Sequence, residues 1–158
     1  MDINKHLQRK FLVIVDGTPE SHAALRFAAR RAHGTGGKVT LLLLLGHDEF
    51  KQWAGIGNLI KEEARTEAEA VLRDLSSRVE ALGGETPEQY VREGNAVDVI
   101  TDLLQEDPTI STLVLAAGSD PAGPGPLVSA LARGRGGFSI PVTVIPAGLL
   151  DDEIDALT

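Results

Sequence analysis

Two short segments of the sequence carry residue types that a nucleotide site needs. Asp16-Gly17-Thr18 follows the apolar run Phe11–Val15, and Gly118-Ser119 follows the run Leu113–Ala117. A carboxylate such as Asp16 can accept hydrogen bonds from a ribose or an amide, and the backbone N–H groups after Gly118 can form an anion nest. A purely structural interpretation, in which Asp16 caps a helix and Gly118 permits a tight turn, fits the spacing equally well.

The segment after Ser119 argues against a phosphate-binding loop. It contains Pro121, Pro124 and Pro126, and proline has no N–H to offer a phosphate. The sequence also lacks a GxxxxGK[ST] loop and a GxSxG nucleophile motif, so we assign no catalytic residue. The histidines show no metal-ligand spacing, and a solvated loop is the simpler interpretation of His47-Asp48-Glu49, so we predict no metal site.

Both candidate segments need a scaffold that brings them together, and the apolar pattern predicts one. Strand-like runs alternate with helical patterns along the chain. Such alternation predicts right-handed βαβ crossovers and a doubly wound parallel sheet with helices on both faces. In that architecture ligands bind outside the carboxyl ends of the strands, where both segments fall. The expected strands are 11–15, 39–45, 88–92, 113–117 and 142–145, and the expected helices are 18–33, 60–82, 95–106 and 127–133.

Length and composition limit the class of protein. The chain has 158 residues, about one domain, with 42% hydrophobic residues and no cysteine, which excludes disulfides and thiol chemistry. The net charge of −8 disfavours nucleic-acid binding. No apolar run is long enough for a membrane span, and the first ten residues have no apolar core, so we expect no membrane or signal segment. These features predict a cytoplasmic protein.

The chain divides into three parts at the sequence level. Residues 1–9 read as an N-terminal extension, residues 10–147 as the domain, and residues 148–158 as an acidic C-terminal tail. The segment Asp151–Thr158 is strongly acidic, and we expect it to be frayed. Pro141 and Pro146 flank the last strand, a position typical of a sheet edge.

The order and spacing of several pieces resemble the universal stress protein family over about residues 9–147. These pieces are Phe11–Ser21, Ala23–Ala28, Val39–Leu42, Val91–Gly94, Ala117–Ser119 and Ile140–Pro146. The resemblance implies a five-stranded parallel sheet in the order 3-2-1-4-5, with helices on both faces. It also implies a homodimer through antiparallel pairing of the last strands, here Val142, Thr143, Val144 and Ile145.

The resemblance further implies where a nucleotide would lie. Val15, Asp16, Gly17, Thr18 and Leu44 match the nucleoside side of the family site, and Gly118, Ser119 and Ser129 match its phosphate side. The second and third glycines of the family's phosphate motif fall on Pro121 and Leu131, and a shifted alignment keeps only Ser129. The phosphate half is therefore degraded.

These observations predict a non-enzymatic, dimeric stress-response regulator or interaction module with weak or absent ATP binding. Its expected partners are a second copy of itself and unknown proteins, without nucleic acid or membrane. The alternative is a member that binds ATP or AMP with Mg²⁺ through a rearranged phosphate loop, with slow hydrolysis.

Overall fold

The computed structural model describes residues 8–15, 19–45, 58–118, 126–132 and 138–158. A single parallel sheet has the strand order β3-β2-β1-β4-β5, as the family resemblance implies. The elements in chain order are β1 (Lys10–Val15), α1 (Pro19–Thr35), β2 (Lys38–Leu45), α3 (Asn58–Ala81), β3 (Glu88–Glu93), α4 (Ala96–Glu106), β4 (Ile110–Ala116), α5 (Pro126–Ala132), β5 (Val142–Ile145) and α6 (Asp151–Leu157).

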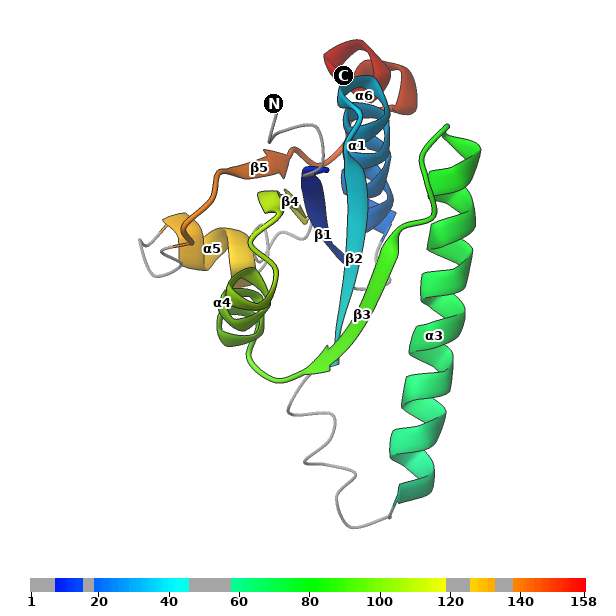
Figure 1. The fold of residues 1–158 in the computed structure, drawn as a ribbon, viewed down its shortest axis with the longest axis vertical. Helices are drawn as coiled ribbons and strands as arrows, with labels where there is room; N and C mark the ends of the chain where they lie inside the picture. The colour runs from blue at the N-terminus through cyan, green and yellow to red at the C-terminus, as the bar shows by residue number, and fades with distance from the viewer. Residues whose placement is uncertain (1–7, 16–18, 46–57, 119–125, 133–137) are drawn as a thin grey trace, which may run out of the picture.

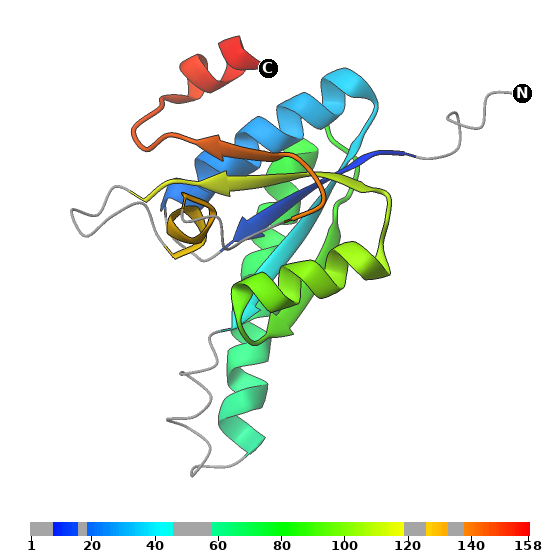
Figure 2. The same ribbon diagram turned by 90° about the vertical axis from the view of Figure 1, so that its left-hand side faces the viewer.

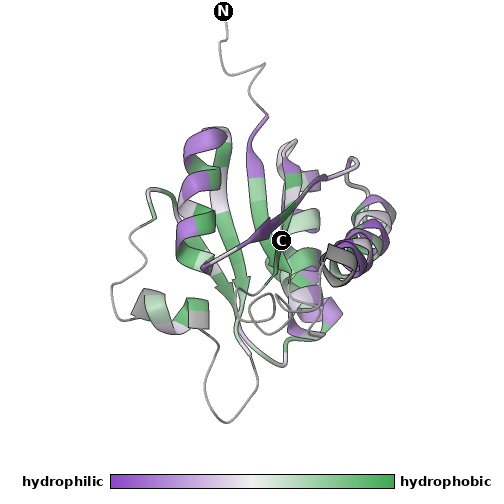
Figure 3. Ribbon diagram, turned by 90° about the horizontal axis from the view of Figure 1, so that it is seen from below, coloured by the Kyte–Doolittle hydropathy of each residue, from purple (hydrophilic) through white to green (hydrophobic). Residues whose placement is uncertain are grey.

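Helices cover both faces of the sheet (Figures 1 and 2), as the unbroken apolar runs predict. Along β1, Val13 and Val15 pack with α1 and α3, whereas Leu12 and Ile14 pack with α4 on the opposite face. The buried residues of β1 from Leu12 to Val15 are all apolar, because both faces of the strand are covered there. Figure 3 shows mostly hydrophobic strands at the centre and many hydrophilic residues on the surrounding helices, whereas the edge strand β3, with the sequence EQYVRE, is largely hydrophilic.

Helix α1 approaches the sheet closely because its inward face is built from small residues. Ala24, Ala28, Ala29 and Ala32 are buried against the strands, and Leu25 fills the space between them. The helix ends at Thr35, and the next residue, Gly36, has φ of +71°, a conformation that glycine adopts without strain. The chain then enters β2, where Lys38 N donates to the Arg9 carbonyl at 2.8 Å.

Helix α4 begins at a side-chain cap, and its sequence positions it over the second core. Asn95 accepts from the backbone N–H of Val97 at 3.0 Å and of Asp98 at 3.3 Å. Ile100 and Leu103 face the sheet and are buried against Leu12 and Leu42.

The C-terminal segment differs from the sequence expectation. The prediction of a frayed tail over Asp151–Thr158 is wrong, because residues Asp151–Leu157 form α6. This short helix packs on α1, and Ile154 is only 1% exposed. Its acidic residues suggested a solvated tail, but two of them meet arginines of α1 that are remote in sequence.

Candidate functional site

The predicted nucleoside residues that the structure describes lie at one edge of the sheet. Val15 is the last residue of β1, and Leu44 is the penultimate residue of β2. In the strand register Val15 pairs with Leu43, so Leu44 lies one residue further along β2 than the partner of Val15. Gly118 follows the end of β4, where Ala117 N donates to the Ile145 carbonyl at 2.9 Å. Because the strands are parallel, all three residues reach the carboxyl edge.

The predicted residues at this edge differ in burial between the two faces of the sheet. Val15 is buried in the core under α1. Leu44 is half-buried on the opposite face, in the same apolar cluster as Leu127 and Val128 of α5. Ser129 lies on α5 and is half-buried. The described part of this edge therefore offers apolar surface and backbone groups, which suit a flat base better than a charged group.

The remaining predicted residues, Asp16, Gly17, Thr18 and Ser119, lie outside the described residues. The same holds for Pro121. The binding role of all the nucleotide residues stays a prediction. Within the described ranges no group of three His, Cys, Asp or Glu side chains could hold a metal ion.

A partly buried charge cluster lies at the opposite, amino-terminal edge of the sheet. Lys10 Nζ lies 2.6 Å from Asp107 Oδ2 and 2.8 Å from Glu88 Oε1. Burial lowers the pKa of Lys10, but the hydrogen bonds to Asp107 and Glu88 outweigh this effect and raise it. Burial raises the pKa of Asp107, but bonds from Lys10 and Thr109 hold it below its usual value.

This cluster is a structural clamp. Lys10 starts β1, Glu88 starts β3, and Asp107 caps the end of α4, so one ammonium group joins three elements. Sequence reasoning missed it because the partners are far apart along the chain: the Lys10–Asp107 bond spans 97 residues. No local pattern connects residues at such a separation.

A shallow groove runs between α3 and the edge strand β3, and sequence reasoning missed it as well. It has a volume of about 420 Å³ and is lined by Arg65, Glu69, Leu72, Arg73, Gln89 and Val91. Along α3, Glu69 lies four residues after Arg65, and Leu72 and the adjacent Arg73 lie three and four residues after Glu69, while the two lining residues of β3 are two apart. These are the spacings of one helix face and one strand face. The groove is open and mixed in charge, and it lies away from the strand ends that hold Val15 and Gly118.

The structure resembles solved universal stress proteins. The protein UspA from Lactobacillus plantarum superposes with a TM-score of 0.71 at 20% identity, covering 87% of this chain and 97% of that one. A universal stress protein in complex with cAMP gives 0.64 at 20% identity, covering 90% and 99%. The Archaeoglobus fulgidus protein in complex with dAMP gives 0.63 at 22% identity, covering 88% and 98%.

A sequence search of curated proteins found no match. Among the described residues, no helix combines the length and hydrophobicity that a membrane span requires. The sequence model of the universal stress protein family matches residues 8–146, which include all five strands. Together with the strand order, this match shows that the chain belongs to the universal stress protein family.

Proposed function

We propose that this chain is a non-enzymatic, dimeric, cytoplasmic stress-response regulator or interaction module that binds ATP weakly or not at all. The observation that carries the proposal is the sequence from the end of β4 to the first residue of α5. Pro121, Pro124 and Pro126 replace amide donors in the stretch that would hold a triphosphate. The chain also carries a net charge of −8, which disfavours a highly charged anion without such donors.

Binding of a nucleotide with a single phosphate is the second candidate. Two relatives of the same fold were solved with cAMP and with dAMP, each of which has one phosphate group. The apolar edge near Leu44 suits an adenine ring, and Asp16 directly follows Val15, where a ribose acceptor is expected. One phosphate needs fewer donors than three, so loss of loop glycines weakens AMP binding less than ATP binding.

Calorimetry separates the two candidates. Wild-type protein is titrated with Mg-ATP and with AMP, alongside Asp16→Ala and the control Asp102→Ala, which removes an exposed carboxylate from α4. We expect no measurable ATP binding and no release of phosphate. A micromolar dissociation constant for ATP that Asp16→Ala abolishes and Asp102→Ala preserves would contradict the first candidate. AMP binding alone, with the same dependence on Asp16, supports the second.

The proposed dimer uses the free edge of β5. This strand pairs only with β4 in the described sheet, so its other edge has backbone groups available for pairing. Val144 is 36% exposed there. Antiparallel pairing with a second β5 joins two sheets into one. Sedimentation at tens of micromolar tests this, and a species of monomer mass alone would contradict the dimer.

A further inference from the structure

The outer edge of β3 is open beside the groove that lies between this strand and α3. In the described sheet β3 pairs only with β2, so no described strand lies along its other side. Gly94 N donates to the Leu45 carbonyl of β2. Because the backbone groups of successive residues in a parallel strand point to opposite sides, the N–H and C=O groups of Gln89 and Val91 point away from β2. These two residues therefore offer backbone groups for pairing along the open edge.

The side chains of the same two residues line the groove. Gln89 Nε2 donates to Ser76 Oγ of α3 at 2.5 Å, and Ser76 is only 5% exposed, so this contact holds the Gln89 side chain in place. Val91 is half-buried and Leu72 of α3 is buried, and both add apolar surface. An extended chain that pairs with β3 would place every second side chain over the groove.

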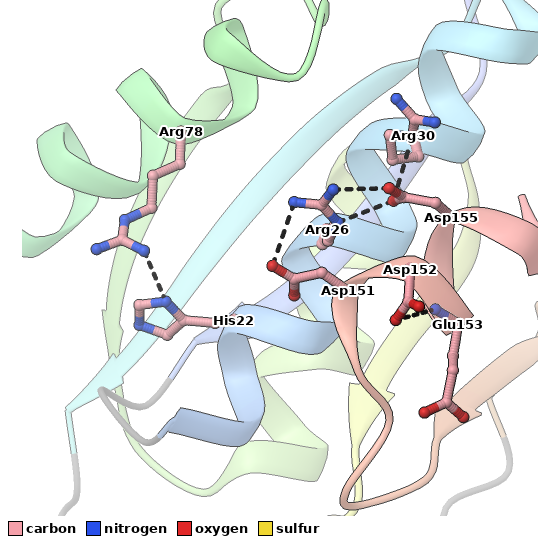
Figure 4. Close-up of polar contacts among 8 residues, drawn as sticks. All are labelled: His22, Arg26, Arg30, Arg78, Asp151, Asp152, Glu153 and Asp155. Atoms are coloured by element: carbon pink, nitrogen blue, oxygen red, sulfur yellow. Dashed lines mark hydrogen bonds and ion pairs between the residues drawn. The ribbon is translucent and has the colours of Figure 1, made fainter.

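Two exposed arginines of α3 at the groove have no carboxylate partner. Arg65 and Arg73 line it, and within the described part of the chain neither makes an ion pair or a side-chain hydrogen bond. By contrast, Figure 4 shows Arg26 and Arg30 of α1 paired with Asp155 of α6. Unpaired guanidinium groups bind carboxylates well, because their N–H groups match the two carboxylate oxygens.

The charged residues of α3 at the groove alternate in sign. Glu69 lies four residues after Arg65 and four before Arg73, so the order along this side of α3, which packs beside β3 (Figure 1), is positive, negative, positive. Arg65 and Arg73 are eight residues apart, about 12 Å along a helix. Residues i and i+4 of an extended strand share a face and lie about 13 Å apart. A strand with acidic residues at i and i+4 and a basic residue at i+2 therefore matches the groove in spacing and charge.

We propose that the groove binds an extended peptide as an added strand along β3, with two carboxylates of the peptide, four residues apart, on Arg65 and Arg73. A basic side chain midway between them faces Glu69. The backbone groups of Gln89 and Val91 provide hydrogen bonds that any peptide sequence can use, and the three charges select the partner. This inference deepens the interaction-module part of the proposed function and rests on that part alone, because β3 and β5 are opposite edges of the sheet.

Fluorescence anisotropy of a labelled, end-blocked peptide tests the proposal on the full chain without nucleotide. The peptide has seven residues, with Glu at its second and sixth positions, Lys at its fourth, and Val or Thr elsewhere. The control peptide has the same composition, but its second Glu is moved to the fifth position, which puts the two carboxylates on opposite faces of an extended strand. We expect the first peptide to bind about tenfold more tightly than the control peptide, and added salt to weaken this binding.

Three variants of the protein identify the groups that bind. Arg65→Gln/Arg73→Gln removes both cations and should weaken binding of the first peptide about tenfold. The matched control, Arg9→Gln/Arg31→Gln, removes the same charge from two exposed arginines outside the groove and should leave binding unchanged. Val91→Pro removes an amide that points away from β2, a position at which an edge strand tolerates proline, and should abolish binding.

Amide exchange measures the added strand independently of the variants. The first peptide should slow exchange of the Gln89 and Val91 amides and leave exchange in β5 unchanged. If Val91→Pro does not fold, this measurement on the wild type decides whether the peptide pairs with β3.

The outcomes separate this inference from the rest of the proposed function. No binding of the first peptide at millimolar concentration, or equal binding of both peptides, overturns the inference and leaves the ATP and sedimentation results as they are. Binding that needs both arginines but leaves Gln89 and Val91 unprotected shows an anion site without an added strand, which overturns it too. Protection that rises with protein concentration in the absence of peptide shows a second copy at this edge and also overturns it. Peptide binding as expected, together with tight ATP binding, supports the inference and contradicts the nucleotide part of the proposed function.

Discussion

The clamp at the amino-terminal edge of the sheet predicts a large effect of Asp107→Ala on stability. Asp107 accepts from Lys10 Nζ at 2.6 Å, from Thr109 N at 3.0 Å and from Thr109 Oγ1. The side chains of Lys10 and Asp107 are only 17% and 15% exposed, so water replaces the lost acceptor poorly.

The magnitude follows from these three contacts. A hydrogen bond to a charged group contributes about 1.5–3 kcal/mol and a neutral one about 0.5–1.5 kcal/mol. In the Asp107→Ala variant Lys10 Nζ still has Glu88 Oε1 at 2.8 Å, and this remaining ion pair limits the loss of stability. We therefore expect Asp107→Ala to lower the free energy of unfolding by about 2–4 kcal/mol. Asp107→Asn keeps an acceptor for Thr109 and should cost about half as much.

Urea unfolding followed by far-ultraviolet circular dichroism, at one protein concentration and neutral pH, measures these differences. Asp102→Ala, an exposed carboxylate on the same helix, is the control and should change stability by less than about 0.5 kcal/mol. An Asp107→Ala variant as stable as this control would refute the clamp. Equal losses for the Ala and Asn variants would show that the charge alone matters, against the role assigned to Thr109.

The pH dependence gives the same clamp a second test. The pKa of Asp107 is lowered in the folded protein, so its contribution is present above the unfolded value of about 3.9 and is lost as pH falls through the folded value. The pKa of Lys10 is raised, so its contribution is present below about 10.4 and is lost as pH rises through the folded value. Asp107→Ala should flatten the acid limb of a stability profile.

Three further predictions concern single positions. Asn95→Ala removes the acceptor of two amides at the start of α4 and should cost about 1 kcal/mol in urea unfolding. Gly37→Ala should lower the melting temperature, because the added Cβ would lie 2.9 Å from the Arg9 carbonyl oxygen. Gly34→Ala is the control, because a Cβ at that position has no atom within 4 Å, and it should not lower the melting temperature. Ile154→Ala should accelerate amide exchange across α6 while exchange in β1 and β4 stays unchanged, and equal acceleration in all three would contradict a locally docked helix.

The parts of the fold that the sequence predicts are those with a local signal. Phe11–Val15 and Leu113–Ala117 are unbroken apolar runs because both faces of their strands are buried, and the structure places β1 and β4 there. Pro141 and Pro146 indicated the edge position of β5, which the strand order confirms. The strand order itself came from the family resemblance, since no local pattern specifies which strands become neighbours.

The parts that the sequence could not predict depend on contacts between distant residues. Helix α6 has few apolar residues, and the burial of Ile154 and the contacts with arginines of α1 hold it in place, so its sequence in isolation resembles a solvated tail. Only part of the candidate site could be predicted from the sequence. Topology brings Val15, Leu44 and Gly118 to one edge, as predicted, but their spacing carries no information on the loops that would complete a phosphate site.

The position of β1 has a consequence for how this chain is made. The strand is the third in a sheet of five, yet it is synthesised before the other four strands, and one of its two neighbours, β4, is complete only at Ala116. The Arg26–Asp155 contact then spans 129 residues, so α6 can pack on α1 only after all five strands have been synthesised. The residues from β1 to β5 must therefore all emerge before the native sheet can close, and until then an apolar strand edge stays open to chaperones and to other nascent chains.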